Sequence, residues 1–164
     1  MTSSFFSGVS HQRTIRYAYN MRETITIQTT QREQLIDVTE AVRSIVKTSS
    51  IQNGIAQVYA QGATGAMMIQ ENWDDSVQLD VVNFLRRLIP PGVWLHDAQD
   101  GNGDAHLKAG LVGPSETIPI IDGELGLSRW QNIFFCEFDG PRAERRIVCT
   151  LIRDTDKEEC APGN

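Results

Sequence analysis

The spacing of apolar positions changes several times along the chain, and each change marks a predicted element. From Thr24 to Thr29, β-branched residues alternate in the way that predicts a strand with Ile25 and Ile27 facing inward. A helical spacing follows, begun by a predicted capping box of Asp37 and Glu40. Its apolar stripe at i, i+3, i+4, i+7 and i+8 consists of Val38, Ala41, Val42, Ile45 and Val46.

The middle of the chain predicts two strands and a second helix. Residues 55–60 are nearly all apolar, which predicts a strand buried on both faces. A turn at residues 61–65 and a short strand at 66–69 follow. The second helix is predicted to begin near Asp74 or Asp75 and to stop at Pro90. Its predicted buried face is formed by Val77, Val81, Phe84, Leu85 and Leu88.

The rest of the chain is mainly β. A polar, Gly-rich loop at residues 97–104 leads to a predicted short helix at 105–112, with Asp104 as its cap. The strand-like runs are residues 117–121, 124–127, 132–138 and 145–152, and Asp122-Gly123 between the first two is a hairpin signal. Strands outnumber helices and do not strictly alternate with them. The prediction is therefore one α+β domain at residues 23–153, with a mixed or antiparallel sheet and flanking helices. Residues 1–22 are predicted to form an arm and 154–164 a frayed tail.

Composition narrows the classes of function. A net charge of −6 disfavours binding to nucleic acid, which needs a basic surface. No apolar run is long enough to predict a membrane span, and the N-terminus lacks the features of a secretory signal. The three cysteines suggest neither a disulfide framework nor a zinc knuckle: Cys136 and Cys149 are predicted core residues and Cys160 a free thiol. The cytoplasm is the predicted compartment.

Candidate chemistry gathers around two histidines. His96 and His106 flank the acidic loop, which adds Asn102 and Asp104. Imidazoles and carboxylates in this arrangement can hold a divalent metal or act as an acid–base pair. The alternative is an ordinary acidic turn with two unrelated histidines.

Three further positions have open interpretations. Glu71, between a strand and a helix, is either a ligand or base or a helix-capping acid. Trp130, taken alone, is a core or interface residue. Glu137 lies in an apolar run and either faces solvent or pairs with a cation such as Arg142.

The same residues carry a family resemblance. The motifs are Ile69-Gln70-Glu71-Asn72, Ala105-His106-Leu107-Lys108-Ala109, Trp130-Gln131 and Glu137-Phe138-Asp139-Gly140-Pro141-Arg142. With His96 and Asn102, they are similar to the YjbQ family of secondary thiamine-phosphate synthases over about residues 24–152. The resemblance implies a compact β-sheet fold with flanking helices and a homotrimer with Trp130 or the neighbouring strands near the contact. It also implies a weak activity that joins an aminopyrimidine diphosphate to a thiazole phosphate and releases diphosphate.

The resemblance further implies a site built on three histidines. Two of them match His96 and His106, but Gly62 replaces the first histidine of a His-Thr-Thr motif that here reads Gly62-Ala63-Thr64. Catalytic roles would fall to His96, His106 and Glu71, with a divalent metal (Mg²⁺ or Zn²⁺) on the two histidines. The implied contacts to a phosphorylated small-molecule ligand are Thr64, Asn102, Asp104, Trp130, Gln131, Glu137 and Arg142.

Gly62 leaves two hypotheses open. The chain is either a YjbQ-like enzyme, or a non-catalytic trimeric protein that keeps the pocket and binds a ligand or a metal. Under the three-histidine hypothesis, Gly62 should leave an imidazole-sized gap beside His96 and His106. A positive φ at Gly62 would make a return to histidine difficult.

Overall fold

The computed structural model describes residues 21–154. Met21 and Arg22, which the sequence assigned to the N-terminal arm, are the first residues of strand β1 (Met21–Thr29). The rest of that arm, the tail beyond Asp154, His11 and Cys160 lie outside the described residues.

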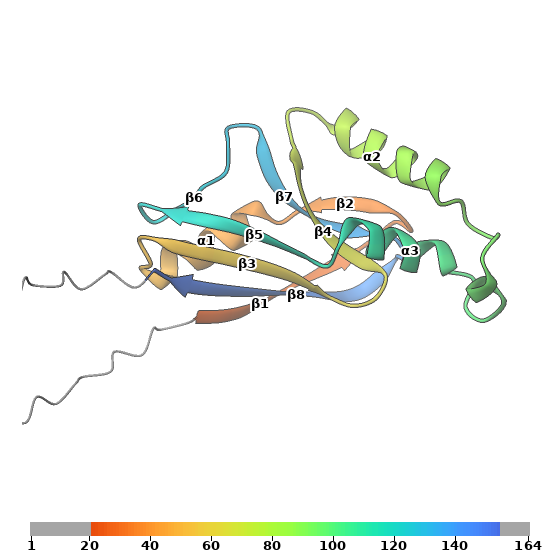
Figure 1. Ribbon diagram of the computed structural model, residues 1–164, viewed down its shortest axis with the longest axis horizontal. Coiled ribbons are helices and arrows are strands. Elements are labelled where there is room, and N and C mark those ends of the chain that lie inside the picture. The colour runs from red at the N-terminus through yellow and green to blue at the C-terminus, as the bar shows by residue number, and fades with distance from the viewer. Residues whose placement is uncertain (1–20, 155–164) are drawn as a thin grey trace, which may run out of the picture.

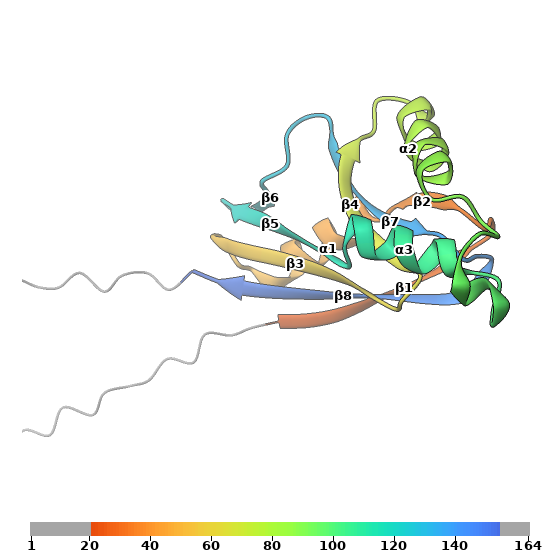
Figure 2. The same ribbon diagram turned by 45° about the vertical axis from the view of Figure 1, so that its right-hand side comes forward.

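The described residues form an α+β domain with two antiparallel sheets, as Figures 1 and 2 show. The larger sheet has the strand order β1-β8-β3-β5-β6 and the smaller one β2-β7-β4. Besides β1, the strands are β2 (Gln34–Asp37), β3 (Gly54–Gln61), β4 (Gly65–Glu71), β5 (Ser115–Ile121), β6 (Glu124–Leu125), β7 (Gln131–Glu137) and β8 (Arg142–Arg153). The helices are α1 (Thr39–Ser49), α2 (Asp75–Leu88), α3 (Gly103–Val112) and the 3-10 turn η1 (Leu95–Ala98).

The three-stranded sheet is covered on both of its faces. Met67 of β4 and Phe135 of β7 belong to the main core, which they share with α1 and the five-stranded sheet. Ala66 and Cys136, one residue away on the same strands, belong to a second cluster with Leu85 of α2 and with Ala105 and Ala109 of α3. Because side chains alternate along a strand, these two clusters lie on opposite faces of the sheet. Residues 133–136 of β7 are therefore buried on both faces, and all four are apolar. This packing positions α2 and α3 on the sheet.

Strand β3 differs from its predicted burial. Ala56, Val58 and Ala60 are buried, but Ile55 is 36% exposed and Tyr59 is 44% exposed. The prediction of two buried faces is wrong within one chain, because no described element covers the outer side of this strand.

The helix starts differ in part from the predicted ones. Val38 is the N-cap residue of α1, and no capping box of Asp37 and Glu40 forms. Asp37 instead accepts hydrogen bonds from Thr39, at 2.9 Å from its backbone N and 2.6 Å from its Oγ1. Helix α2 begins at Asp75, as predicted, and Asp74 is its N-cap residue, accepting a hydrogen bond from Ser76 N at 2.8 Å.

Helix α2 buries a narrower stripe than the sequence predicted. Val82 and Leu85 are buried, whereas Phe84 and Leu88 are more than half exposed. The helix packs through one edge onto the three-stranded sheet, so only residues on that edge reach the core. None of the helices within residues 21–154 is long and apolar enough to span a bilayer.

Two details confirm predictions from local sequence. Asp122 and Gly123 both have positive φ, as the hairpin signal requires. Cys136 and Cys149 are fully buried, and this burial raises the pKa of their thiols to about 12 and about 11. Neither thiol is a reactive thiolate at neutral pH.

Candidate functional site

The structure brings His96 and His106 together, as the sequence predicted. Their ring centroids lie 4.9 Å apart and the ring planes meet at 87°. His96 belongs to η1, and its Nε2 lies 3.8 Å from Asp100 Oδ2. His106 is in the first turns of α3 and is half-buried. Two imidazoles from separate elements therefore share one surface position.

Asp97 holds the loop between the histidines closed. Its Oδ2 accepts from Trp94 N at 2.8 Å and its Oδ1 accepts from Gly103 N at 2.8 Å. The carboxylate thus ties the residue before η1 to the first residue of α3. The acidic composition of the loop indicated carboxylates near the histidines but did not reveal this clamp.

We expect the Asp97 clamp to be lost only in strong acid. The hydrogen bond from Trp94 N, followed by that from Gly103 N, lowers the pKa of Asp97 below its ordinary value of 3.8. A lowered pKa means that the stabilisation is complete above pH 3.8 and is lost as the pH falls through the folded-state pKa. The amide NMR signals of Trp94 and Gly103 should therefore stay constant from neutral pH to about pH 4 and shift together only below it. A midpoint above pH 5 would contradict this assignment.

Gly103 is required where α3 begins. A Cβ at this position would lie 2.8 Å from Trp94 Cβ and 2.9 Å from Asp97 Oδ1. We expect Gly103→Ala to break the clamp and to lower the free energy of unfolding by about 1–3 kcal/mol. Gly110, with no heavy atom within 4 Å of its Cβ position, is the matched control. Gly110→Ala should be neutral or stabilising in the same urea titration, and equal losses for both variants would contradict the steric explanation.

A buried network of charges lies beneath the start of α3. Asp104, predicted to cap this helix, instead lies within it, and Asn102 is the N-cap residue. Asp104 is fully buried, and its carboxylate accepts hydrogen bonds from Lys108 Nζ at 2.7 Å and from Arg32 Nη2 at 2.9 Å. Lys108, also fully buried, donates to Glu33 Oε1 at 2.5 Å. The network fixes α3 to the segment before β2.

Asn102 connects the histidine loop to the β7–β8 turn. Its Nδ2 donates to Asp139 Oδ2 at 3.0 Å. Burial alone would raise the pKa of Asp139, but hydrogen bonds from Asn102 and Arg142 outweigh it, and the pKa lies below its ordinary value. Asn102 Oδ1 is buried and has no hydrogen-bond donor among the described residues. It is an acceptor beside the histidine loop that is free to bind a donor.

Glu137 pairs with Arg145 and not with Arg142. Arg145 donates to the fully buried Glu137 carboxylate through Nε at 2.8 Å and through Nη2 at 2.6 Å. Arg145 Nη2 also donates to Thr64 Oγ1 at 2.9 Å, so Thr64 is fixed by this pair. Arg142 binds Asp139. The sequence could not choose between two arginines three residues apart.

Position 62 is next to the same ion pair. Around a Cβ built on Gly62, the one neighbouring heavy atom within 4 Å is Arg145 Nη1, at 3.5 Å. Neither imidazole is that close, so the predicted gap does not directly adjoin the histidine rings. Gly62 is also absent from the residues with positive φ, so the predicted backbone obstacle to histidine is wrong.

Glu71, Trp130 and Gln131 lie at the opposite end of the three-stranded sheet. Glu71 pairs with Gln131 in the register of β4 and β7, while Gly65, next to Thr64, pairs with Glu137. Six residues of strand separate the two ends by about 20 Å. At the far end Trp130 packs edge-to-face on Trp73 at 4.7 Å, beneath the guanidinium of Arg129. Within one chain, these three residues are not part of the histidine site.

The histidine pair fits part of a metal site. Two imidazoles on one tetrahedral zinc, with Zn–N bonds of about 2 Å, have ring centres about 5 Å apart. The observed 4.9 Å agrees with this separation. Within residues 21–154, however, no group of three or more His, Cys, Asp or Glu side chains is placed to hold a metal ion. His96 and His106 would supply two ligands, and the others must come from a ligand, from solvent or from a second chain.

Comparison with known proteins decides the family. The family model described as UPF0047 protein YjbQ-like matches residues 23–154. The chain belongs to this YjbQ-like family. A UPF0047 protein of Methanocaldococcus jannaschii is 47% identical over 128 residues, covering 78% of this chain and 91% of the relative. The UPF0047 protein YugU of Bacillus subtilis is 37% identical over 125 residues, covering 74% and 92%.

Solved structures of YjbQ-like proteins share the fold. A YbjQ-like protein of unknown function from Sulfolobus solfataricus has a TM-score of 0.81 and 31% identity, covering 84% of this chain and all of that one. A YjbQ/UPF0047 protein from Clostridium acetobutylicum has a TM-score of 0.76 and 37% identity, covering 79% and 99%. Both neighbours agree with the α+β assignment made from the sequence.

Proposed function

We propose that this YjbQ-like protein binds a phosphorylated small molecule and a divalent metal at the His96–His106 pair. The proposal is supported chiefly by the 4.9 Å approach of the two rings. Neutral imidazoles are suitable ligands for zinc, and carboxylates or phosphate oxygens complete such sites.

Nearby cations favour a ligand that carries phosphate. Arg32 and Arg142 are each about half exposed. Arg32 binds Asp104 of α3, and Arg142 binds Asp139, which also accepts a hydrogen bond from Asn102. Guanidinium groups match the geometry of phosphate oxygens. Asn102 Oδ1 adds an acceptor that a hydroxyl or amine on the same ligand could satisfy.

The reaction we propose is thiamine-phosphate formation. An aminopyrimidine diphosphate loses its diphosphate, and the ring nitrogen of a thiazole phosphate forms the new C–N bond. A divalent metal held by the histidines would stabilise the charge on the departing diphosphate. The chain's own residues orient the phosphates through Arg32 and Arg142. Glu71, at the opposite end of the three-stranded sheet, takes no part in this step unless a neighbouring subunit supplies it.

The second candidate is a non-catalytic binding protein. Gly62 favours it, because an imidazole that the family resemblance places at this position is missing, and Arg145 borders the space instead. Ligand and metal binding would remain while turnover is lost.

Two assays separate these candidates. Purified protein is incubated with aminopyrimidine diphosphate, thiazole phosphate and Mg²⁺ or Zn²⁺, and thiamine phosphate is measured by liquid chromatography. Binding of inorganic diphosphate is measured separately by calorimetry. We expect His106→Ala to abolish both signals and Asp80→Asn, on the exposed side of α2, to change neither. Diphosphate binding without product supports the second candidate, whereas no binding at all contradicts both.

We also propose a homotrimer. The uncovered outer side of β3, with Ile55 and Tyr59, and the exposed Trp130 supply apolar surface for a subunit contact. Light scattering at micromolar concentration should give the mass of three chains. A monomer mass would contradict the assembly without bearing on the histidine site.

A further inference from the structure

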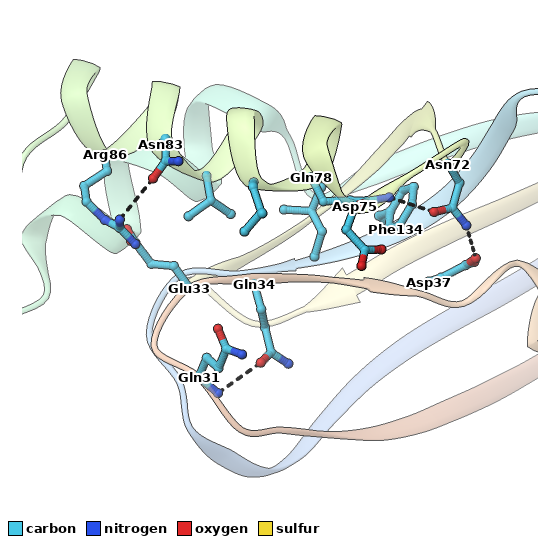
Figure 3. Close-up of a pocket in the computed structure, with 13 residues that line it drawn as sticks. Gln31, Glu33, Gln34, Asp37, Asn72, Asp75, Gln78, Asn83, Arg86 and Phe134 are labelled. Carbon is cyan, nitrogen blue, oxygen red and sulfur yellow. Dashed lines mark hydrogen bonds and ion pairs between the residues drawn. The ribbon is translucent and has the colours of Figure 1, made fainter.

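A groove between α2 and β2 is separate from the histidine pair. It has a volume of about 480 Å³ and also includes Asn72, which follows β4, and Phe134 from the middle of β7. Figure 3 shows α2 along one side of the groove and the β2 segment along the other. Arg86 and Glu33 lie at one end, and Asn72, Asp37 and Asp75 lie at the other.

The groove combines apolar and amide surface. Leu35, Val82 and the buried Phe134 supply apolar contacts. Five amide side chains line it as well, namely Gln31, Gln34, Asn72, Gln78 and Asn83. A mixed lining of this kind suits a ligand with a flat apolar body and a few polar groups.

Charge at the Arg86 end is compensated. Glu33 is bound by Lys108 Nζ at 2.5 Å and by Arg86 Nη2 at 2.6 Å. Arg86 is the one cation in the lining, and it also donates to Asn83 Oδ1 at 3.3 Å. This end therefore has no unpaired charge with which to attract an anion.

Charge at the other end is not compensated. Asp37 accepts four hydrogen bonds, and all of the donors are neutral: the backbone N and hydroxyl of Thr39 and the amides of Asn72 and Asn132, at 2.6–2.9 Å. Asp75 makes no side-chain hydrogen bond within residues 21–154. No described cation lies within 4.0 Å of either carboxylate.

We propose that this groove binds an organic cation, an amidinium or ammonium group carried on a flat apolar ring. The cation lies at Asp75, with Asp37 behind it, and the ring packs on Val82 and Leu35. Two uncompensated carboxylates attract a cation and repel a phosphate. The site needs neither the histidine pair nor a metal, so it stands or fails independently of the proposed function.

The test uses benzamidine as the cationic probe and benzamide as its neutral match. Each is titrated into the full ¹⁵N-labelled protein at low salt. We expect benzamidine to shift the side-chain amide signals of Asn72, Gln78 and Asn83 in a saturable way. Benzamide should bind at least about tenfold more weakly than benzamidine. Raising the salt concentration should weaken benzamidine binding.

Variants locate the cation. Asp75→Asn, at an exposed helix position, should weaken benzamidine by about tenfold without loss of fold. Asp80→Asn and His106→Ala should leave its affinity unchanged, as should added inorganic phosphate. Equal binding of benzamidine and benzamide would overturn the proposal, as would unchanged affinity in Asp75→Asn. The proposal is also overturned if the groove signals do not respond and Val82→Asp lowers the oligomer mass, because the groove is then an interface between copies of the chain.

Discussion

Replacing Lys108 by methionine should lower the free energy of unfolding by about 3–5 kcal/mol. The Lys108 side chain is 0% exposed and lies between the carboxylates of Asp104 and Glu33, at 2.7 and 2.5 Å. Methionine keeps the length of the side chain but removes its charge. Both carboxylates then stay buried with one arginine each, Arg32 and Arg86. Urea unfolding followed by circular dichroism measures the loss.

A matched lysine and a second variant test the cause. Lys47 is exposed, and its Nζ lies 3.6 Å from Glu124 Oε1. Lys47→Met should therefore lower the free energy of unfolding by less than about 1 kcal/mol. Adding Glu33→Gln to Lys108→Met should recover part of the loss, because it removes one of the two buried carboxylates that have lost their contact with the lysine. If Lys108→Met costs no more than Lys47→Met, the network does not hold α3 in place.

Restoring the family's histidine and threonine at positions 62 and 63 should strengthen metal binding. We expect Gly62→His with Ala63→Thr to raise zinc affinity by at least about 100-fold, since it adds an imidazole to a pair that supplies only two ligands. Gly62 is exposed and has no positive φ, and the nearest atom to a new Cβ is Arg145 Nη1 at 3.5 Å. The backbone and the available space therefore permit the change.

Folding of the double variant is checked by thermal melting. Ala63→Thr alone, which adds no imidazole, is the control and should leave zinc affinity unchanged. If the double variant melts like the wild type but binds zinc no more tightly, position 62 does not face the histidine pair in the assembled protein. The three-histidine hypothesis would then be wrong for this chain.

Local signals in the sequence predicted the fold well. The stripe of α1 and the Asp122-Gly123 hairpin need only neighbouring residues, and both were predicted correctly. Strand β2 was missed, because it has four residues and polar ends. The exposed outer side of β3 was missed because burial of a strand depends on what covers it, which an apolar run does not reveal.

The site was predicted only where its residues are close in the sequence. His96 and His106 meet because a short loop joins them, and sequence proximity was enough to indicate this. The pairs Glu33–Lys108 and Thr29–Glu137 join residues 75 and 108 positions apart, and no local pattern shows such contacts. Asp104 and Lys108 have the i, i+4 spacing of a helical ion pair, a signal that could have located half of the network. The separation of Glu71 and Trp130 from the histidines follows from strand direction, which the motifs alone do not give.

Calorimetric titration of zinc into the wild type, His96→Ala and His106→Ala tests the central claim most directly. If the two imidazoles share one ligand, the wild type binds one zinc ion per chain, and either substitution weakens that binding by at least about 100-fold. His11→Ala, which removes the third histidine of the sequence, should change neither affinity nor stoichiometry. Wild-type affinity retained in both His96→Ala and His106→Ala would contradict the claim that this pair forms the functional site.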